Sequence, residues 1–368
     1  MKLRLLTLIT LLFAFCAVTA QEPTIIPTPR QYCSNGGEFT LNKDCKIGWT
    51  NDKLEPIAHF LADYLQIEAE ADGTDIILGH LWEGADEEYS VAISEHNIVI
   101  SGGDYGGVFN GVVTLLQLLP EEVYSHSLEL PTTIECCTID DAPRYPHRGF
   151  MLDPCRTWMT KEAIMDYIDL LALHKINNLR LHLTDDEAWR LEIKSHPELA
   201  EVGGFRGGHS PIWPRYGKWN ERWGGYYTQD DMREIIAYAA VRNIEVIPEI
   251  DLPGHSLCMA TMHPEILCNY EPNKSRAFGY DTRSAFCPTK EANYELLEDI
   301  LKEVCELFPT SYIHIGGDEV DMSQWRRCPD CQAFMRKNGM ANESELQRYF
   351  MSRLTEILAK YGKPPAVR

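Results

Sequence analysis

The sequence predicts an α/β fold, in which a small α+β domain precedes a (β/α)8 TIM barrel that is truncated after about four βα units. Three observations support this prediction. Short apolar runs alternate with helical apolar stripes from residue 147 onward, as in parallel βα architecture. The segment Asp141–Pro146, with its two prolines, separates this region from the strand before it. Polar residues follow the predicted strands, and active sites form at the C-terminal ends of barrel strands.

Residues 1–20 are expected to be a signal peptide. Lys2 and Arg4 precede an apolar stretch, and Val18–Ala20 provides small residues for cleavage. The apolar stretch is too short to span a bilayer, and no later segment predicts a membrane span. We therefore expect export to the periplasm or the cell exterior. Lipid anchoring through Cys16 is the alternative, and the bulky aromatic residue before that cysteine argues against it.

Residues 22–143 are predicted to form the small N-terminal domain. Its strands are expected at Asp75–Leu78, Tyr89–Ile93 and Asn97–Ile100, where β-branched and aromatic residues are concentrated. Phe109–Leu119 has the apolar spacing of an amphipathic helix.

The predicted barrel domain covers residues 147–368. Its four strands are expected at His147–Asp153, Asn178–Thr184, Ile244–Ile250 and Ser311–Gly316. Its helices are expected at Lys161–His174, Gln229–Val241, Glu291–Leu307 and Glu343–Tyr361. Only seven residues follow Tyr361, whereas a complete barrel has eight βα units in about 250 residues. We therefore expect either a half-built barrel or a fragment of a longer protein.

Charge and cysteine content limit the function further. The net charge of −21 argues against binding to nucleic acid or to anionic membrane surfaces. Twelve cysteines, of which only Cys16 lies in the expected signal peptide, predict some disulfides in an oxidising compartment. For Cys328-Pro-Asp-Cys331 a local disulfide is favoured over half of a zinc site, because the chain has no second Cys-x-x-Cys and no matching histidine pair.

The segment Tyr312–Val320 carries the strongest chemical motif. A short buried strand ends at Gly316-Gly317 and is followed directly by Asp318 and Glu319. At ~5 Å and an effective dielectric constant of ~20, two such carboxylates repel each other by ~3 kcal/mol. One can therefore stay ionised while the other keeps a proton near neutral pH, which suits an acid paired with an electrostatic stabiliser. The alternative is that the pair caps the next helix.

This motif resembles the signature of family 20 glycoside hydrolases, the β-N-acetylhexosaminidases, in which an Asp-Glu pair ends the fourth barrel strand. Three further segments are similar to motifs of the same family, in the same order. They are Arg148–Asp153 with Arg156, His182–Asp186 with Trp189–Glu192, and Val246–His255.

The resemblance implies exo-acting hydrolysis of terminal β-linked N-acetylglucosamine or N-acetylgalactosamine from glycans or oligosaccharides. The implied mechanism retains configuration and uses the substrate's 2-acetamido group as the nucleophile. Asp318 would orient that amide and stabilise the oxazolinium charge, and Glu319 would act as general acid and then base. The resemblance implies no metal and no organic cofactor, and no catalytic residue in the N-terminal domain.

Three residues are expected to bind or prepare the substrate. Arg148 would grip sugar hydroxyls, Asp185 would be the pocket carboxylate, and His255 would help to tune the proton on Glu319. Asp186 is a close second to Asp185 for the pocket. The structural alternatives are an Arg148 ion pair within its own strand and capping of the loop after the second strand by the two aspartates.

The chain also departs from the family pattern. The aromatic walls that family members place around the sugar come from later strands, so Trp213, Trp219 and Trp223 could form only an outer rim. A half barrel would expose a strand edge, so we expect poor solubility or a need for a partner, with slow turnover. The alternative function is a non-catalytic carbohydrate-binding remnant. Cys268 and Cys287 resemble a loop-closing disulfide of some relatives. Sugar preference and oligomeric state stay open.

Overall fold

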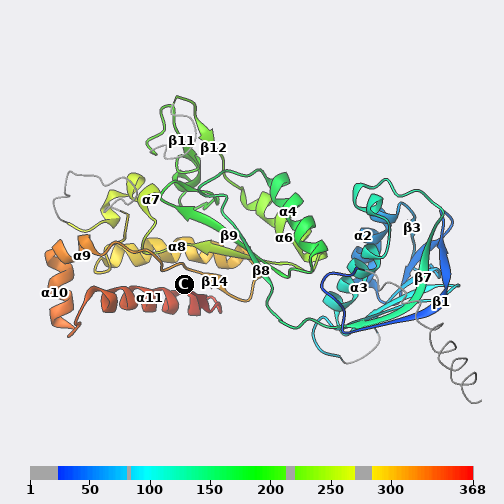
Figure 1. Ribbon diagram of the computed structural model, residues 1–368. Helices are drawn as coiled ribbons and strands as arrows, with labels where there is room; N and C mark the ends of the chain where they lie inside the picture. Colours follow the sequence, from blue (N-terminus) through cyan, green and yellow to red (C-terminus); the bar gives the residue numbers. More distant parts are fainter. Residues whose placement is uncertain (1–23, 81–83, 213–219, 270–283, 368) are drawn as a thin grey trace, which may run out of the picture. The chain divides into compact units, whose positions relative to one another are not determined.

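The computed structural model describes residues 24–80, 84–212, 220–269 and 284–367 and divides the chain into two compact units (Figure 1). These units are residues 1–146 and 147–368. The expected signal peptide, including Cys16, lies outside the described residues. Within the described part, no helix is both long enough and apolar enough to cross a bilayer.

In its described residues, the N-terminal unit consists of a seven-stranded mixed sheet and two α-helices. Its strands are β1 (Gln31–Leu41), β2 (Lys46–Trp49), β3 (Glu68–Ala69), β4 (Ile76–His80), β5 (Tyr89–Ile93), β6 (Ile98–Gly102) and β7 (Thr132–Asp141), in the spatial order β1-β7-β5-β6-β4-β2-β3. Helices α2 (Glu55–Leu65) and α3 (Tyr105–Gln117) lie together against the sheet (Figure 1). Phe60 and Phe109 join the two helices, with ring centroids 5.1 Å apart.

The sequence prediction missed the longest strand pair of this unit. Strands β1 and β7 pair in antiparallel register, but β1 is mostly polar and its register shifts between Ser34 and Glu38. Gly36 and Gly37 occupy that bulge with positive φ angles of 70° and 86°. A glycine pair within polar sequence predicts a turn, and β1 has no apolar alternation that would indicate a strand.

The second unit contains the parallel strands. They are β8 (Gly149–Leu152), β9 (Asn178–Asp185), β13 (Glu245–Ile250), β14 (Ile313–His314) and β15 (Pro365–Ala366), and each is parallel to the next. The short strand β10 (Ala188–Trp189) pairs antiparallel with β9. A separate two-stranded ribbon consists of β11 (Phe205–Arg206) and β12 (Trp223–Gly224).

Helices connect these strands along the chain. The four long ones are α4 (Lys161–Leu173), α6 (Gln229–Val241), α8 (Glu291–Leu307) and α11 (Glu343–Lys360). The short ones are α5 (Glu198–Glu201), α7 (Leu257–Met262), α9 (Ser323–Arg327) and α10 (Pro329–Lys337). Side-chain caps fix two of the helix starts, because Thr160 accepts from Ala163 N–H before α4 and Thr228 forms a capping box with Asp231 before α6.

The predicted fold is confirmed: an N-terminal α/β domain precedes a βα unit of the barrel type. The predicted bounds of α6 and α8 match the structure. Strand β14 is shorter than expected, because Gly316 and Gly317 leave the extended region with φ angles of 67° and 112°. After α11 the chain returns to the sheet, and β15 pairs with β14 as a fifth parallel strand.

The predicted disulfides are not formed. Every cysteine in the described part is a free thiol, including Cys328 and Cys331, which were expected to bond to each other, and Cys268 and Cys287. These four residues instead gather in one buried cluster.

Candidate active site

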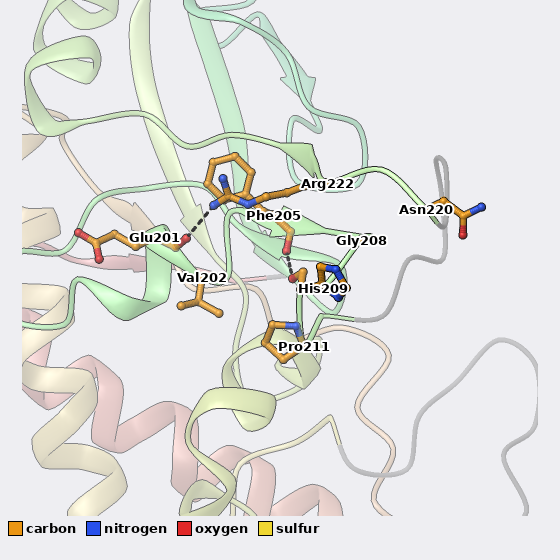
Figure 2. A pocket seen from close by; sticks show the side chains of 9 residues that line it. Glu201, Val202, Phe205, Gly208, His209, Pro211, Asn220 and Arg222 are labelled. Carbon is orange, nitrogen blue, oxygen red and sulfur yellow. Dashed lines mark hydrogen bonds between the residues drawn. The ribbon is translucent and has the colours of Figure 1, made fainter.

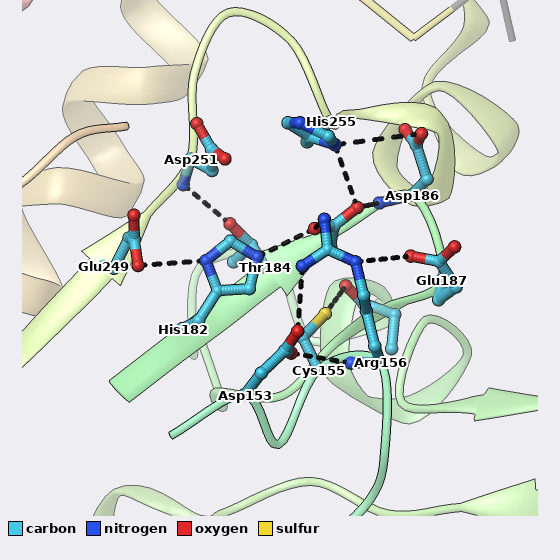
Figure 3. Close-up of polar contacts among 12 residues, drawn as sticks. Asp153, Cys155, Arg156, His182, Thr184, Asp186, Glu187, Glu249, Asp251 and His255 are labelled. Atoms are coloured by element: carbon cyan, nitrogen blue, oxygen red, sulfur yellow. Dashed lines mark hydrogen bonds and ion pairs between the residues drawn. The ribbon is translucent and has the colours of Figure 1, made fainter. Parts of the chain in front are cut away.

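The C-terminal ends of β8, β9 and β13 bring charged side chains together (Figure 3). On β9, two charged side chains and one hydroxyl, those of Arg180, His182 and Thr184, alternate with leucines. Successive residues of a strand point to opposite faces, so these three share one face of the sheet. A parallel strand buried on both faces is usually apolar throughout, which makes the polar alternation a marker of function.

His182 lies fully buried between two carboxylates. Its Nε2 is 2.8 Å from Oδ2 of Asp185, and its Nδ1 is 3.0 Å from Oε2 of Glu249. Burial lowers the pKa of His182, but hydrogen bonds to Asp185 and Glu249 outweigh this effect and raise it to about 10. The imidazole is therefore a cation near neutral pH, paired on both sides.

Glu249 extends the network to β14. A second histidine, His314, places Nδ1 3.2 Å from the Glu249 carboxylate and Nε2 2.8 Å from Nη1 of Arg180. Burial raises the pKa of Glu249, yet its contacts with the imidazoles of His182 and His314 hold it well below its usual range. The buried charges are thus compensated in pairs, as stable burial requires.

Asp185 is the centre of the site. It contacts three cations: His182, His255 (Nδ1 to Oδ1, 3.1 Å) and Arg156 (Nη2 to Oδ2, 2.5 Å). Burial raises the pKa of Asp185, but the hydrogen bonds from His182 and His255 outweigh burial and keep it well below its ordinary value. Asp185 is therefore an ionised anchor rather than a proton donor.

His255 links Asp185 to the Asp-Glu pair. Its Nε2 lies 3.5 Å from Oε2 of Glu319, while its Nδ1 contacts Asp185. Burial lowers the pKa of His255, but the Asp185 carboxylate outweighs burial and raises it to about 9. The structure thus brings together the three predicted residues Asp185, His255 and Glu319.

Asp318 and Glu319 follow β14 and face different surroundings. The Glu319 side chain is 55% exposed. By contrast, one carboxylate oxygen of Asp318, one of Asp251 and one ring nitrogen of His255 lie within 4.8 Å of one another. Gln347 of α11 holds the backbone here by donating to the Gly317 carbonyl at 2.6 Å. One carboxylate is therefore open to a substrate and the other is set deeper.

The double glycine is needed because Asp251 approaches the backbone. A Cβ on Gly316 would lie 1.7 Å from Oδ1 of Asp251, and the residue has a φ angle of 67°. The next amide, Gly317 N–H, donates to the same Oδ1 at 3.2 Å. Asp251 thereby fixes the turn that leads into Asp318.

Two buried aspartates hold protons more tightly than usual. Burial raises the pKa of Asp251 to about 7, with His255 opposing the rise and Asp318 adding to it. Burial and the neighbouring Asp185 raise the pKa of Asp186 to about 7. Asp186 also accepts a hydrogen bond from Leu257 N–H, the first residue of α7, so it caps the helix after β13, whereas the structural alternative was capping of the loop after β9.

Arg148 does not lie with this group, contrary to the sequence prediction. It precedes the first residue of β8, and its Nε donates to the Lys175 carbonyl ahead of β9. That position is the N-terminal end of the strands, opposite to the carboxylates. The arginine at the C-terminal end is Arg156, which pairs with three carboxylates, namely Asp185, Asp153 (2.8 Å) and Glu187 (3.8 Å).

Two family models match the chain. The model "Glycosyl hydrolase family 20, catalytic domain" matches residues 145–367, which is more than half of the chain. The chain belongs to glycosyl hydrolase family 20. The model of domain 2 of the same family matches residues 22–142.

Similar proteins with the name beta-hexosaminidase also support the assignment to family 20. The chain is 37% identical over 352 residues to a beta-hexosaminidase of Porphyromonas gingivalis, covering 92% of this chain and 44% of the relative. It is 35% identical to a beta-hexosaminidase of Vibrio furnissii, covering 94% of this chain and 57% of the relative. The chain thus spans about half the length of these curated relatives.

Solved structures of family 20 share the fold. A family 20 exo beta-N-acetylglucosaminidase from Vibrio harveyi, in complex with N-acetylglucosamine, has a TM-score of 0.85 at 34% identity, covering 93% of this chain and 54% of that one. A beta-N-acetylhexosaminidase from Bacteroides fragilis has a TM-score of 0.79 at 29% identity, covering 93% and 65%.

A buried arginine, Arg190, fastens the loop that carries Arg156. Arg190 is fully buried, and its guanidinium donates to four backbone carbonyls. The acceptors are Pro154, Cys155, Gly204 and Gly225. The loop after β8 is therefore tied to the long excursion after β9.

One hollow lies away from the carboxylates. It has a volume of about 560 Å³ and lies in the excursion between β9 and α6 (Figure 2). Arg222 covers the Phe205 ring there at 3.5 Å from the centroid and donates to the Glu201 carbonyl. By contrast, the cavity beside Asp185 and His255 is about 10 Å³, room for about one water molecule.

The expected aromatic rim is only partly described. Trp213 and Trp219 lie outside the described residues. Trp223 stacks against the guanidinium of Arg206, 4.4 Å from the ring centroid, and Arg190 lies 6.0 Å from the same ring. Its packing therefore involves buried arginines of the same excursion.

Proposed function

We propose that this chain acts in the exo-hydrolysis of terminal β-linked N-acetylglucosamine or N-acetylgalactosamine from glycans or oligosaccharides. The observation that carries the proposal is the half-exposed Glu319 after β14, contacted by His255, which is itself anchored on the buried Asp185. Relatives named beta-hexosaminidase support the same reaction class.

The proposed mechanism retains the anomeric configuration with help from the substrate. Glu319 gives a proton to the departing glycosidic oxygen while the carbonyl oxygen of the 2-acetamido group attacks the anomeric carbon. The C–O bond to the leaving group breaks, and an oxazolinium ring forms. Glu319 then takes a proton from the water that opens the ring. The different exposure of the two neighbouring carboxylates supports this division of roles.

Asp318 would orient the acetamido group and stabilise its positive charge. A fixed carboxylate close to a developing cation lowers the barrier most when it is shielded from water. Asp318 meets this condition, because it lies beside the buried Asp251 and behind the glycine turn. Charge build-up on the amide nitrogen is therefore expected opposite this carboxylate.

Arg156, rather than Arg148, lies at the C-terminal end of the strands. We therefore assign to Arg156 the role of binding the sugar hydroxyls or of orienting the carboxylates. Its side chain is about one-third exposed while it pairs with the buried Asp185, so it is accessible at this end of the strands. We also propose export of the protein, supported by the charged and apolar pattern of residues 1–20.

Release of p-nitrophenol from its β-N-acetylglucosaminide and β-N-acetylgalactosaminide tests the function. The assay is run on this chain and on the protein encoded by the complete reading frame that contains it. Glu319→Gln is expected to lower kcat by roughly 10²–10⁴-fold. Glu295→Gln is the matched control, because Glu295 is exposed on α8. Glu319-independent turnover, or none in either protein, would overturn the proposal.

The substrate-assisted step needs its own test. A thiazoline analogue of the bicyclic intermediate is expected to inhibit competitively, and Asp318→Asn is expected to weaken its binding more than the binding of N-acetylglucosamine. Proton NMR of the first-formed sugar should show the β-anomer. Formation of the α-anomer would rule out the retaining mechanism while leaving hydrolysis itself intact.

A further inference from the structure

A second cluster of reactive side chains lies outside the carboxylate–histidine site. It consists of four buried cysteines, Cys268, Cys287, Cys328 and Cys331, whose Sγ atoms all lie within 4.8 Å of one another. The Sγ of Cys331 is 3.6 Å from that of Cys268 and 3.8 Å from that of Cys287.

We propose that these four cysteines bind one structural Zn²⁺ ion as a tetrathiolate site. Four sulfurs at ~2.3 Å from a tetrahedral zinc ion are separated by about 3.8 Å from each other. The two sulfur–sulfur distances given above, 3.6 and 3.8 Å, match that separation. A disulfide requires ~2.05 Å between its sulfurs, so the cluster has the spacing of a metal site and not of two bonded pairs.

One half of the site is a Cys-x-x-Cys at a helix start. Cys328 is the residue that precedes α10, and Cys331 lies in the first turn of that helix. The positive end of the helix dipole favours thiolates, which are the form that binds zinc. The helix is nine residues long and begins with Pro329, so the two sulfurs are held on a rigid turn.

The other half is held by backbone hydrogen bonds. Cys287 N–H donates at 2.8 Å to the carbonyl of Ile266, two residues before Cys268 in the chain. The indole of Trp325 donates to the Phe286 carbonyl at 2.9 Å, which fixes the residue before Cys287. The hydroxyl of Thr289 lies 3.3 Å from the Cys287 sulfur, where it can donate to a thiolate. Two distant chain segments are thereby brought to one point.

The surroundings close the site to solvent. All four cysteines are buried, and they pack with Ala285, Trp325, Met335 and Leu346. Four thiols in an apolar shell have few other polar partners, so a metal ion that replaces their protons compensates the buried sulfurs. Binding would release the thiol protons to solvent and leave a site with a formal charge of −2, partly offset by the helix dipole.

The site lies close in sequence and in space to the Asp-Glu pair. Val320, which directly follows Glu319, and Met322, three residues after it, pack against the same cysteine cluster. A metal ion here would fasten the segment between β14 and α9, and with it the position of Glu319. This consequence rests on the proposed function, whereas the metal site itself does not.

Metal analysis of the full chain tests the proposal directly. The protein is purified without metal-affinity resin and examined by elemental mass spectrometry and thiol titration. We expect about one zinc ion per chain, and four thiols that react only after chelation or unfolding. Mass-spectrometric detection of disulfides among these cysteines, freely reactive thiols without metal, or iron in place of zinc would overturn the assignment.

Variants separate a metal site from a packing cluster. Cys331→Ser is expected to lower zinc content several-fold, and Cys331→His, which keeps a ligand, is expected to restore part of it. Cys305→Ser is the matched control, because Cys305 is a buried cysteine of α8 outside the cluster. Replacement of zinc by cobalt(II) in the unmodified chain should give the charge-transfer and ligand-field bands of a tetrahedral tetrathiolate. Their absence would contradict the proposal, whatever the hydrolase activity.

Discussion

The imidazole Nε2 of His255 lies 3.5 Å from the carboxylate of Glu319, and both residues have left-handed backbone conformations, with φ angles of 47° and 48°. Left-handed conformations are uncommon for residues other than glycine and cost free energy. Two separate loops, after β13 and β14, hold such conformations and meet at their side chains. The fold therefore maintains a strained arrangement where the proposed acid is positioned.

The charge of His255 depends on Asp185. We expect Asp185→Asn to lower the pKa of His255 from about 9 toward its ordinary value near 6.5, because the anionic partner at 3.1 Å is lost. Histidine Cε1–H chemical shifts measured against pH would report this change. In the unmodified chain the raised pKa contributes stability below about pH 6.5 that is lost as the pH rises through about 9. A pKa that stays near 9 in the variant would contradict the assignment.

Arg156 and Arg148 should respond differently to the same change. Arg156→Lys is expected to reduce kcat/KM at least ~10-fold, because a lysine cannot bridge the carboxylates that the guanidinium fork joins. Arg148→Lys, at the other end of β8, is expected to leave kcat/KM within about twofold and to alter mainly the melting temperature. A larger catalytic loss in Arg148→Lys would restore the original expectation that Arg148 binds the sugar.

Gly316 should tolerate no side chain. Gly316→Ala places a methyl group 1.7 Å from Asp251 at a positive φ, and we expect it to destabilise the protein by more than ~3 kcal/mol or to displace the Asp-Glu turn. Gly339→Ala is the control, because Gly339 has a φ of 66° with no atom within 4 Å of the added carbon. It should cost only about 1 kcal/mol. Equal losses in urea unfolding of the two variants would mean that steric contact with Asp251 is unimportant.

The protonation of Asp251 should make stability fall between about pH 4 and pH 7. An acid whose pKa is raised by folding holds its proton better in the folded state, so its contribution is lost as the pH rises from the unfolded value toward about 7. Asp251→Asn mimics the protonated form. The variant should gain stability relative to the unmodified chain between pH 5 and pH 8, by on the order of 2–4 kcal/mol. Urea unfolding at both pH values measures this difference, and a pH-independent difference would contradict it.

Periodic features were predictable from the sequence, and long-range contacts were not. The caps of α4 and α6 and the apolar stripes of the long helices are local, so their bounds could be predicted closely. The convergence of Asp185, His255 and Glu319 was expected from the resemblance to family 20, and it agrees with parallel strands that end at one edge. Arg148 was misplaced because the arginine heads its strand motif, whereas the charged end of that strand is reached only at Arg156.

The cysteine cluster shows the same limit. Cys328 and Cys331 are close in sequence, and spacing alone suggested a bond between them. Cys268 and Cys287 are separated from that pair by the whole of α8 and β14, and nothing local indicates that they meet it. Likewise, the need for Gly316 depends on Asp251 of a neighbouring strand end, which no single segment contains.

The carbonyl contacts of Arg190 have a consequence for motion. The Arg190 guanidinium donates to four buried carbonyls that would otherwise need ordered water molecules as donors. Unlike water, the side chain is bonded to the chain and cannot diffuse away. The loop after β8 should therefore exchange its amide hydrogens as slowly as the strands do, and should keep one shape before, during and after a catalytic cycle. A ligand arriving at Arg156 would meet a surface already set in its final form.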